Sequence, residues 1–115
     1  MITDFSSWRI FVRPGATDLR KASNGLMVLA EQTMGHNPFG SHLFLFCNRD
    51  RKLLKALYWD QNGFCLWQKR LEKDHFPWPK NDVEAREITY EQLKLLLAGI
   101  DFWKAHQSLH FQHVS

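Results

Sequence analysis

The sequence predicts an α+β fold: a mostly antiparallel β-meander sheet of about five strands, packed with two helices in a single compact domain. First, residues 42–79 alternate apolar blocks with turn residues and basic residues. Second, residues 18–34 and 89–98 carry apolar side chains at helical spacing. Third, 115 residues suffice for one domain that buries about two-thirds of its unfolded surface. We expect this domain to span residues 1–101 and a histidine-rich tail to span 102–115.

The first strand is expected over residues 8–13, where alternate side chains separate onto two faces. These faces are Trp8, Ile10 and Val12, and Arg9, Phe11 and Arg13. Pro14-Gly15 then ends the strand with a turn. A helix should follow from Asp18 to Met34, with Thr17 or Asp18 as its N-cap and Gly35 as its C-cap.

The central meander starts with a strand over residues 42–47, which is apolar on both faces and therefore belongs in the middle of the sheet. Two further strands are expected over 53–59 and 64–70, joined by a hairpin at Asp60–Gly63 that carries the Asn-Gly signal. The sequence does not set the loop length. A one-residue change there exchanges the faces on which Trp59 and Trp67 appear.

The remaining elements follow local signals. Residues 75–79 contain two prolines and should be extended. A short edge strand is expected through Arg86 and Ile88. The last helix has a capping box, in which Thr89 is the N-cap and Gln92 reaches back to it. Ile88 can pack on Leu93 as a hydrophobic staple, and Gly99 can end the helix.

Composition indicates a folded soluble protein, with 44% hydrophobic and 23% charged residues. The net charge of +3 and the pI near 9.0 mildly favour a polyanionic partner. No apolar run approaches the ~18 residues of a membrane span, so we expect a cytoplasmic protein without membrane contact. Cys47 and Cys65 lie inside apolar strands and are read as reduced, buried side chains rather than a disulfide or metal pair.

Catalytic patterns are weak. Several carboxylates invite a search for a metal-dependent nuclease: Asp18, Asp60, Glu72, Asp82 and Asp101. A cap or turn role accounts for three of them, because Asp18 lies at a helix start, Asp60 in a hairpin turn and Asp101 beside a helix end. His106, His110 and His113 have helical spacing that would suit adventitious metal binding, with no acid or thiol ligand nearby. There is no GxSxG, P-loop or GxGxxG motif. We therefore expect a protein that is not an enzyme and has no cofactor and no functional metal site.

What remains is an interleaving of basic and aromatic residues. Arg and Lys side chains bind phosphates, whereas exposed Trp side chains can stack on bases. The alternative is a solvated sheet rim with tryptophans in the core. The candidate DNA-binding residues are Arg20, Lys21, Arg49, Arg51, Lys52, Lys55, Trp59, Trp67, Lys69 and Arg70.

The succession of motifs is more specific than any one of them. In order they are PGATDLRKASNGL, HLFLFCNRDRKLLKALYWDQNG, LWQKRLEKDHFPWP and ITYEQLKLLLAGID. Together they resemble the small accessory protein called TnpB, the second open reading frame of insertion-sequence-66-type bacterial transposons. The resemblance covers about Phe11 to Asp101, so the histidine-rich tail lies outside it.

Particular positions carry this resemblance: Gly15, Thr17, Asp18, Arg20, Lys21, Gly25, Leu26, Leu43, Phe44, Phe46, Asn48, Arg49, Lys52, Lys55, Trp59, Asp60, Gly63, Lys69, Arg70, Leu71, Glu72, Phe76, Trp78 and Pro79. Asn24 stands where the family usually has Asp, and Ala22-Ser23 replaces a Gly plus a bulky residue. Asp74-His75 replaces a small-basic pair, which lowers the local positive charge and weakens the case for a contact near residue 75.

The resemblance implies a bacterial mobile genetic element and a role in transposition, a DNA recombination process, beside a larger transposase that carries the strand-transfer chemistry. We hypothesise a non-catalytic accessory factor that binds transposon-end DNA through its basic and aromatic surface. The alternative is an interaction module that docks onto the transposase subunit or forms a homodimer without touching DNA. A metal-dependent nuclease is the third hypothesis, with the least support.

Overall fold

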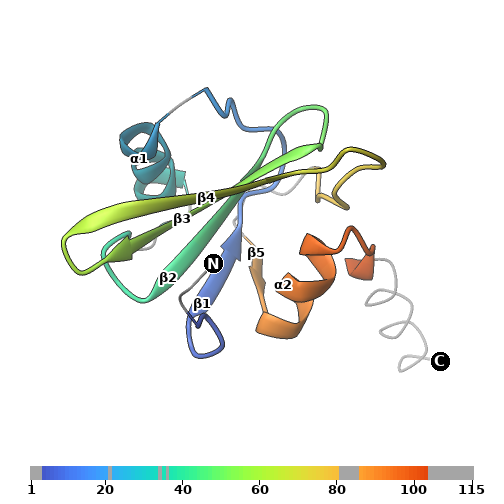
Figure 1. Cartoon of the computed structure of the whole chain (residues 1–115). Coiled ribbons are helices and arrows are strands. Elements are labelled where there is room, and N and C mark those ends of the chain that lie inside the picture. The colour runs from blue at the N-terminus through green and yellow to red at the C-terminus, as the bar shows by residue number, and fades with distance from the viewer. Residues whose placement is uncertain (1–3, 21, 34, 36, 81–85, 104–115) are drawn as a thin grey trace.

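A computed structural model describes the chain except residues 1–3, 21, 34, 36, 81–85 and 104–115. Its order along the chain is one strand, a helix, four strands and a second helix (Figure 1). The elements are β1 (Arg9–Val12), α1 (Ser23–Thr33), β2 (His42–Cys47), β3 (Leu53–Asp60), β4 (Gly63–Arg70), β5 (Arg86–Ile88) and α2 (Tyr90–Leu97).

The five strands form one sheet in the order β4-β3-β2-β1-β5, and this confirms the predicted fold class. β1 pairs in parallel with β2, whereas the other three pairings are antiparallel. α1 is the crossover between the two parallel strands. β2 lies at the centre, and its residues from Leu43 to Cys47 are all fully buried, as its two apolar faces predict. β5 is an edge strand, also as predicted.

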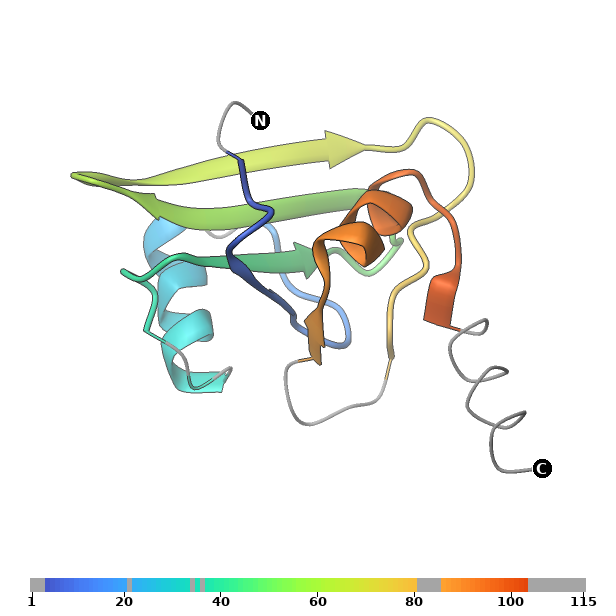
Figure 2. The ribbon, with the colours of Figure 1, turned by 90° about the horizontal axis from the view of Figure 1, so that it is seen from below.

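The two helices cover opposite faces of the sheet (Figure 2). The face under α1 is built on seven buried residues: Phe11, Leu19, Leu26, Ala30, Phe44, Phe46 and Leu57. The other face, under α2, buries Ile10, Val12, Leu43, Leu45, Leu54, Leu93 and Leu96, among others. The alternation predicted for the first strand is confirmed, because Ile10 and Val12 lie on the α2 face and Phe11 lies on the α1 face.

The β3–β4 hairpin has a loop of two residues. Asp60 pairs with Gly63, so Gln61 and Asn62 make the turn. Gln61 takes the left-handed conformation, with φ of 51°. This loop length places Trp59 opposite Phe64 and Trp67 opposite Ala56. Trp59 therefore faces the α1 side, whereas Trp67 faces the α2 side.

α1 starts later than predicted, at Ser23 rather than Asp18. Thr17 is 5% exposed, and its backbone N–H donates to the carbonyl of Cys47 at the end of β2. The Asp18 carboxylate instead accepts the backbone N–H of Arg20, which is a local turn motif. Neither residue caps the helix, because the chain first crosses the end of the sheet. Gly35, with φ of 69°, follows the helix end.

α2 has the caps that the sequence predicts. The Thr89 hydroxyl accepts the backbone N–H of Gln92, and the Gln92 side chain accepts the N–H of Thr89. At the other end, Gly99 has φ of 79°, and two backbone bonds form a Schellman motif, Gly99 N–H to Leu96 and Ile100 N–H to Leu95. Phe102, just past this motif, is 5% exposed and belongs to the core on the α2 face.

Candidate nucleic-acid interface

The chain reverses direction repeatedly at one edge of the sheet, where several strands end or begin. β1, β2 and β4 end there and β3 begins there, as the pairings of Val12 with Leu45, Cys47 with Leu54 and Leu53 with Arg70 require. Three segments meet at this edge: the β1–α1 loop (residues 13–22), the β2–β3 turn (48–52) and the extended segment (75–80). The two carboxyl ends of the parallel strands lie here, which is where α/β units usually place their ligands.

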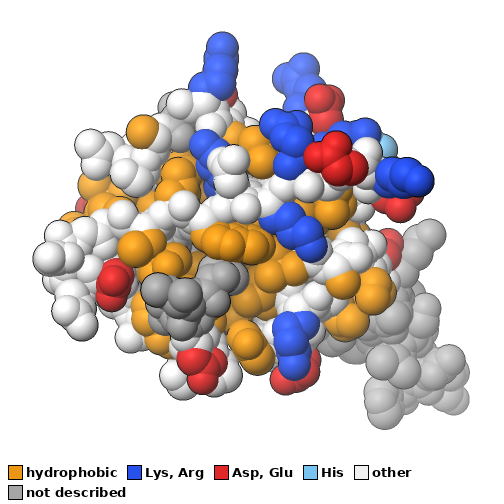
Figure 3. Space-filling model, in the orientation of Figure 1, with side chains coloured by type: hydrophobic (Ala, Val, Ile, Leu, Met, Phe, Trp, Pro, Cys, Tyr) orange, Lys and Arg blue, Asp and Glu red, His pale blue; other side chains and the backbone are white. Residues whose placement is uncertain are grey.

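We group five of the described cationic residues at this end of the sheet as the basic edge: Arg49, Arg51, Lys52, Arg70 and Lys80. Their side chains make no hydrogen bond or ion pair with any part of the chain that the structure describes. Figure 3 shows the Lys and Arg side chains gathered mainly at the upper right, with acidic side chains among them and none of the basic ones at the left tip. Asp50, Glu72 and Asp74 are exposed at this end, so its charge is mixed.

Two described cations far from this edge are paired with carboxylates. Arg9, near the opposite end of β1, lies 2.7 Å from the Glu87 carboxylate, and this hydrogen-bonded partner raises the pKa of Arg9. Lys94 on α2 lies 2.9 Å from Glu91, and the pKa of Lys94 is raised in the same way. The cations of the basic edge keep their full hydrogen-bonding capacity for a partner outside the described chain.

The β2–β3 turn holds its cations on a fixed backbone. The Asn48 side chain accepts the backbone N–H groups of Lys52 and Leu53, each at 3.1 Å. Arg51 donates its N–H to the Asn48 carbonyl and accepts the N–H of Phe76 at 2.7 Å. Arg51 also has φ of 58°, in the left-handed region. This conformation costs a non-glycine residue about 1–2 kcal/mol.

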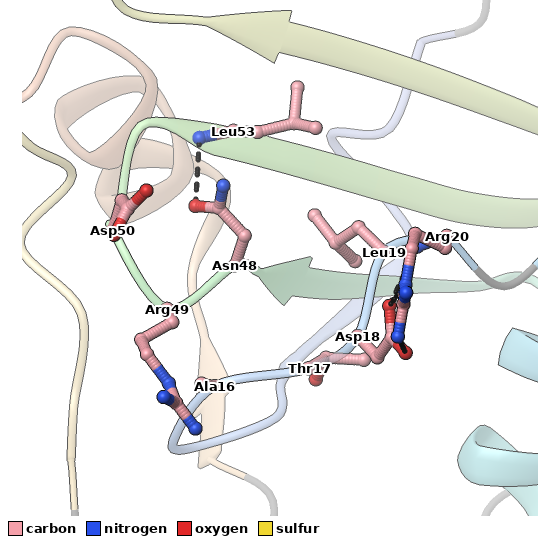
Figure 4. A pocket seen from close by; sticks show the side chains of 9 residues that line it. All are labelled: Ala16, Thr17, Asp18, Leu19, Arg20, Asn48, Arg49, Asp50 and Leu53. Atoms are coloured by element: carbon pink, nitrogen blue, oxygen red, sulfur yellow. Dashed lines mark hydrogen bonds and ion pairs between the residues drawn. The ribbon is translucent and has the colours of Figure 1, made fainter.

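Two open clefts lie side by side at the edge and share Ala16, Asn48 and Arg49. The larger, of about 530 Å³, is bounded by the β1–α1 loop and the β2–β3 turn (Figure 4). Its lining includes Asp18 and Asp50 as well as Arg20 and Arg49, so it is mixed in charge. The smaller, of about 320 Å³, lies against the extended segment, and we call it the Trp78 cleft. Its lining is Gly15, Ala16, Asn48, Arg49, Arg51, Trp78, Pro79 and Lys80.

The structure brings together four of the ten candidate residues at the basic edge: Arg49, Arg51, Lys52 and Arg70. Arg20 lies nearby, but its guanidinium is paired with Asp18 at 2.8 Å, as Figure 4 shows. This hydrogen-bonded carboxylate raises the pKa of Arg20. Lys21 lies outside the described residues.

Lys55 and Lys69 are used within the fold. The Lys55 ammonium donates to the Leu19 carbonyl at 2.8 Å, which ties β3 to the segment before α1. The Lys69 ammonium donates to the Leu97 carbonyl at 2.7 Å, at the carboxyl end of α2. Lys55 faces the α1 side and Lys69 faces the α2 side, so the two do not share a surface.

The two candidate tryptophans are also separated. Trp59 lies at the hairpin end, away from the basic edge, in a partly exposed aromatic cluster with Phe39 and Phe64. Trp67 packs against the core on the α2 face.

Sequence reasoning did not single out Lys80 or Trp78 as site residues. Lys80 stands alone in a polar connector, and only the path of residues 75–80 along the basic edge brings it beside Arg49 and Arg51. The sequence feature that could have identified Trp78 is the pair of prolines on either side of it. These prolines indicated an extended segment that fixes the position of the Trp78 ring. The Trp78 indole N–H donates to the Arg13 carbonyl at 2.9 Å.

The candidate carboxylates do not form a cluster. Among the described residues, no three His, Cys, Asp or Glu side chains lie together in a way that could hold a metal ion. Asp82 and the three tail histidines lie outside the described part. No helix in that part is long and apolar enough to cross a membrane.

Comparison with known proteins decides the family. Residues 8–107 match the family described as IS66 Orf2-like protein. The chain belongs to the IS66 Orf2-like family. This confirms the resemblance drawn from the sequence motifs and gives the chain an accessory role in transposition, in a family that is not known to be catalytic.

Two curated relatives of this IS66 Orf2-like protein come from Sinorhizobium fredii (strain NBRC 101917 / NGR234). One, "Uncharacterized protein y4hO", is 35% identical over 107 residues, covering 93% of this chain and 92% of the relative. The other, "Uncharacterized protein y4jC", is 31% identical over 102 residues, covering 89% and 87%. No solved structure matches the chain.

Proposed function

We propose that this IS66 Orf2-like protein assists transposition by binding the phosphate backbone of transposon-end DNA with its basic edge. The observation that carries the proposal is the gathering of Arg49, Arg51, Lys52, Arg70 and Lys80 at one sheet edge without partners in the described chain. Unpaired Arg and Lys side chains release the counterions of DNA when they bind it. The strand-transfer chemistry is left to a separate transposase.

Salt dependence tests the proposal. Affinity for a transposon-end duplex should fall with salt, with a log-log slope of about −0.9 for each phosphate contacted. We expect a slope that corresponds to about three to five phosphates. A slope below about two phosphates contradicts the proposal.

A matched pair of variants locates the contact. Replacing Arg49, Lys52 and Arg70 by Gln should reduce the slope by about three phosphates while the protein keeps its thermal stability. The control, Lys94→Gln on α2, removes one paired cation away from the edge and should leave the slope unchanged. Equal effects of the edge and control variants would show that the basic edge is not the contact.

Docking onto the transposase is the second candidate. One observation favours it: Phe39 is 51% exposed and packs on Trp59 and Phe64 at the hairpin end, and Leu66 beyond them is 37% exposed. Exposed aromatic side chains are frequent anchors of protein interfaces. If Phe39→Ala and Leu66→Ser abolish co-purification with the transposase while DNA affinity stays intact, this cluster is a docking surface.

A further inference from the structure

We propose that the Trp78 cleft is a seat for a single phosphate group, which Arg49, Arg51 and Lys80 bind together. This deepens the proposed function and rests on it, because a DNA backbone or a DNA end would supply the phosphate. It adds a specific claim: the residues of the basic edge do not contribute equally to DNA affinity, and those that line the Trp78 cleft contribute most.

The two clefts differ in the charged side chains that line them. Among the described residues, three cationic side chains and no carboxylate line the Trp78 cleft. The neighbouring cleft has two carboxylates, Asp18 and Asp50, beside its two arginines. Of the two clefts, the Trp78 cleft therefore offers an anion the more favourable lining among the described residues. Guanidinium and ammonium groups are the usual ligands of phosphate.

The wall of the cleft is held by backbone contacts. Trp78 is 6% exposed and its indole N–H is bonded to the Arg13 carbonyl, while the Gly15 N–H donates to the Pro79 carbonyl at 2.8 Å. Gly15 has φ of 78°, and a Cβ added there would meet the Lys80 carbonyl at 3.4 Å. The β1–α1 loop and the extended segment thus stay in contact, and Lys80 lines the same cleft as Arg51.

A backbone donor also lies in the lining. Ala16 follows the left-handed Gly15, and its N–H makes no hydrogen bond with the part of the chain that is described. The N–H groups on either side of it, those of Gly15 and Thr17, are both used within the fold. Backbone N–H groups next to a left-handed residue commonly bind anions, so Ala16 supplies a neutral donor beside the three cations.

The conformation of Arg51 is the strongest argument. Glycine or asparagine takes the left-handed conformation more easily than arginine does. Arg51 nevertheless stands at φ of 58°, and its guanidinium makes no hydrogen bond or ion pair within the described chain. Glycine would take this backbone conformation without strain and could keep both backbone hydrogen bonds of Arg51. A strained residue that faces a cation-lined cleft is best explained by a ligand that the side chain binds.

Arg51→Gly separates binding from folding. The variant should keep or raise the melting temperature, because glycine relieves the strain. Its affinity for a transposon-end duplex should fall by about tenfold or more, the usual effect of losing a charge-assisted hydrogen bond. The matched control is Lys73→Gln, an exposed cation in the bend after β4 that does not line the cleft. It should lower affinity by only a few-fold.

Titration with inorganic phosphate, followed by amide NMR, tests the seat without DNA. The Ala16 amide signal should shift on titration in the wild type and in Lys73→Gln, and should stay in place in Arg51→Gly and Lys80→Gln. If the Ala16 signal does not move in the wild type, or moves equally in all variants, the seat does not exist. If it moves as expected while DNA binding shows no salt dependence, the proposed function fails and the phosphate seat stands.

Duplexes with and without a 5′-phosphate identify the source of the phosphate. If Arg51→Gly weakens both duplexes equally, the cleft binds an internucleotide phosphate. If it weakens only the 5′-phosphorylated duplex, the cleft binds a DNA end. Both results support binding of a DNA phosphate in the cleft. If Arg51→Gly weakens neither duplex more than Lys73→Gln does, the cleft does not bind a DNA phosphate.

Discussion

Cys47 shows how strongly burial acts on a single side chain. It is fully buried at the end of β2, and this burial raises the pKa of its thiol to about 12 from an ordinary value of 9.0. Cys65 on β4 is only partly buried, and both thiols are free. The thiolate is the reactive form, so a thiol reagent at neutral pH should modify Cys65 and leave Cys47 intact until the protein unfolds.

The same pKa shift predicts a loss of stability in alkali. The unfolded chain ionises Cys47 near pH 9.0, whereas the folded chain keeps it neutral to about pH 12. The unfolded state therefore binds fewer protons in this window, and the free energy of unfolding should fall as pH rises through it. Urea denaturation as a function of pH measures the slope. Cys47→Ala should have a shallower slope than the wild type, and an unchanged slope in this variant would contradict the prediction.

The Lys69 side chain caps the carboxyl end of α2. The Schellman bonds satisfy the carbonyls of Leu95 and Leu96, and the Lys69 ammonium satisfies that of Leu97. A cation at a helix carboxyl end also interacts favourably with the helix dipole. We expect Lys69→Met to lower the free energy of unfolding by about 1 kcal/mol.

Lys69 and its neighbour Arg70 should have opposite effects on stability and on DNA affinity. Arg70, adjacent in sequence, lies on the other face, and Arg70→Met should leave stability unchanged and reduce DNA affinity. Denaturation and salt-dependent binding of both variants check the assignment. If Lys69→Met changes only binding and Arg70→Met changes only stability, the two roles have been exchanged.

At the scale of elements, α2 is fixed by short-range signals. Ile88 and Leu93 are both buried on either side of the capping box, as a hydrophobic staple requires. Thr89→Ala removes the hydroxyl that accepts the Gln92 N–H and should lower the free energy of unfolding by about 1 kcal/mol. Thr89→Ser retains the hydroxyl and should lower the free energy of unfolding by only a few tenths of the loss expected for Thr89→Ala. Equal losses in the two variants would mean that the hydroxyl is not what stabilises the helix.

The contrast between α2 and α1 explains what the sequence can predict. The bounds of α2 follow from Thr89, Gln92 and Gly99, whose effects are felt within one helical turn. The start of α1 was wrong by five residues because Thr17 and Asp18 have cap-like side chains but are used elsewhere. The Thr17 backbone N–H donates to the Cys47 carbonyl, and this contact depends on the parallel pairing of β1 with β2. No local sequence pattern predicts that pairing.

At the scale of the whole molecule, the basic edge was half predictable. Arg49, Arg51 and Lys52 are close in sequence, so a turn was bound to bring them together. Arg70 joins them because a two-residue hairpin loop pairs it with Leu53. Lys80 joins them through the path of the extended segment. The positions of Lys55 and Lys69 depend on where the helices dock, and for that reason sequence reasoning grouped these two lysines with the surface cations.

Phe102 and Trp103 link the core to the Trp78 cleft. Phe102 is buried beside Trp103, with ring centroids 4.2 Å apart, and the Trp103 indole N–H donates to the Pro77 carbonyl in the segment that carries Trp78. A chain ended after Asp101 loses both rings, and relative to a chain ended after Trp103 it should lose about 3 kcal/mol of stability. Urea denaturation of the two chains measures this difference, and Phe102→Ala in the full chain should reproduce most of it. Because Pro77 loses its anchor, the shorter chain should also bind inorganic phosphate more weakly under conditions where it is still folded. Equal stabilities of the two chains would show that the core ends at Asp101.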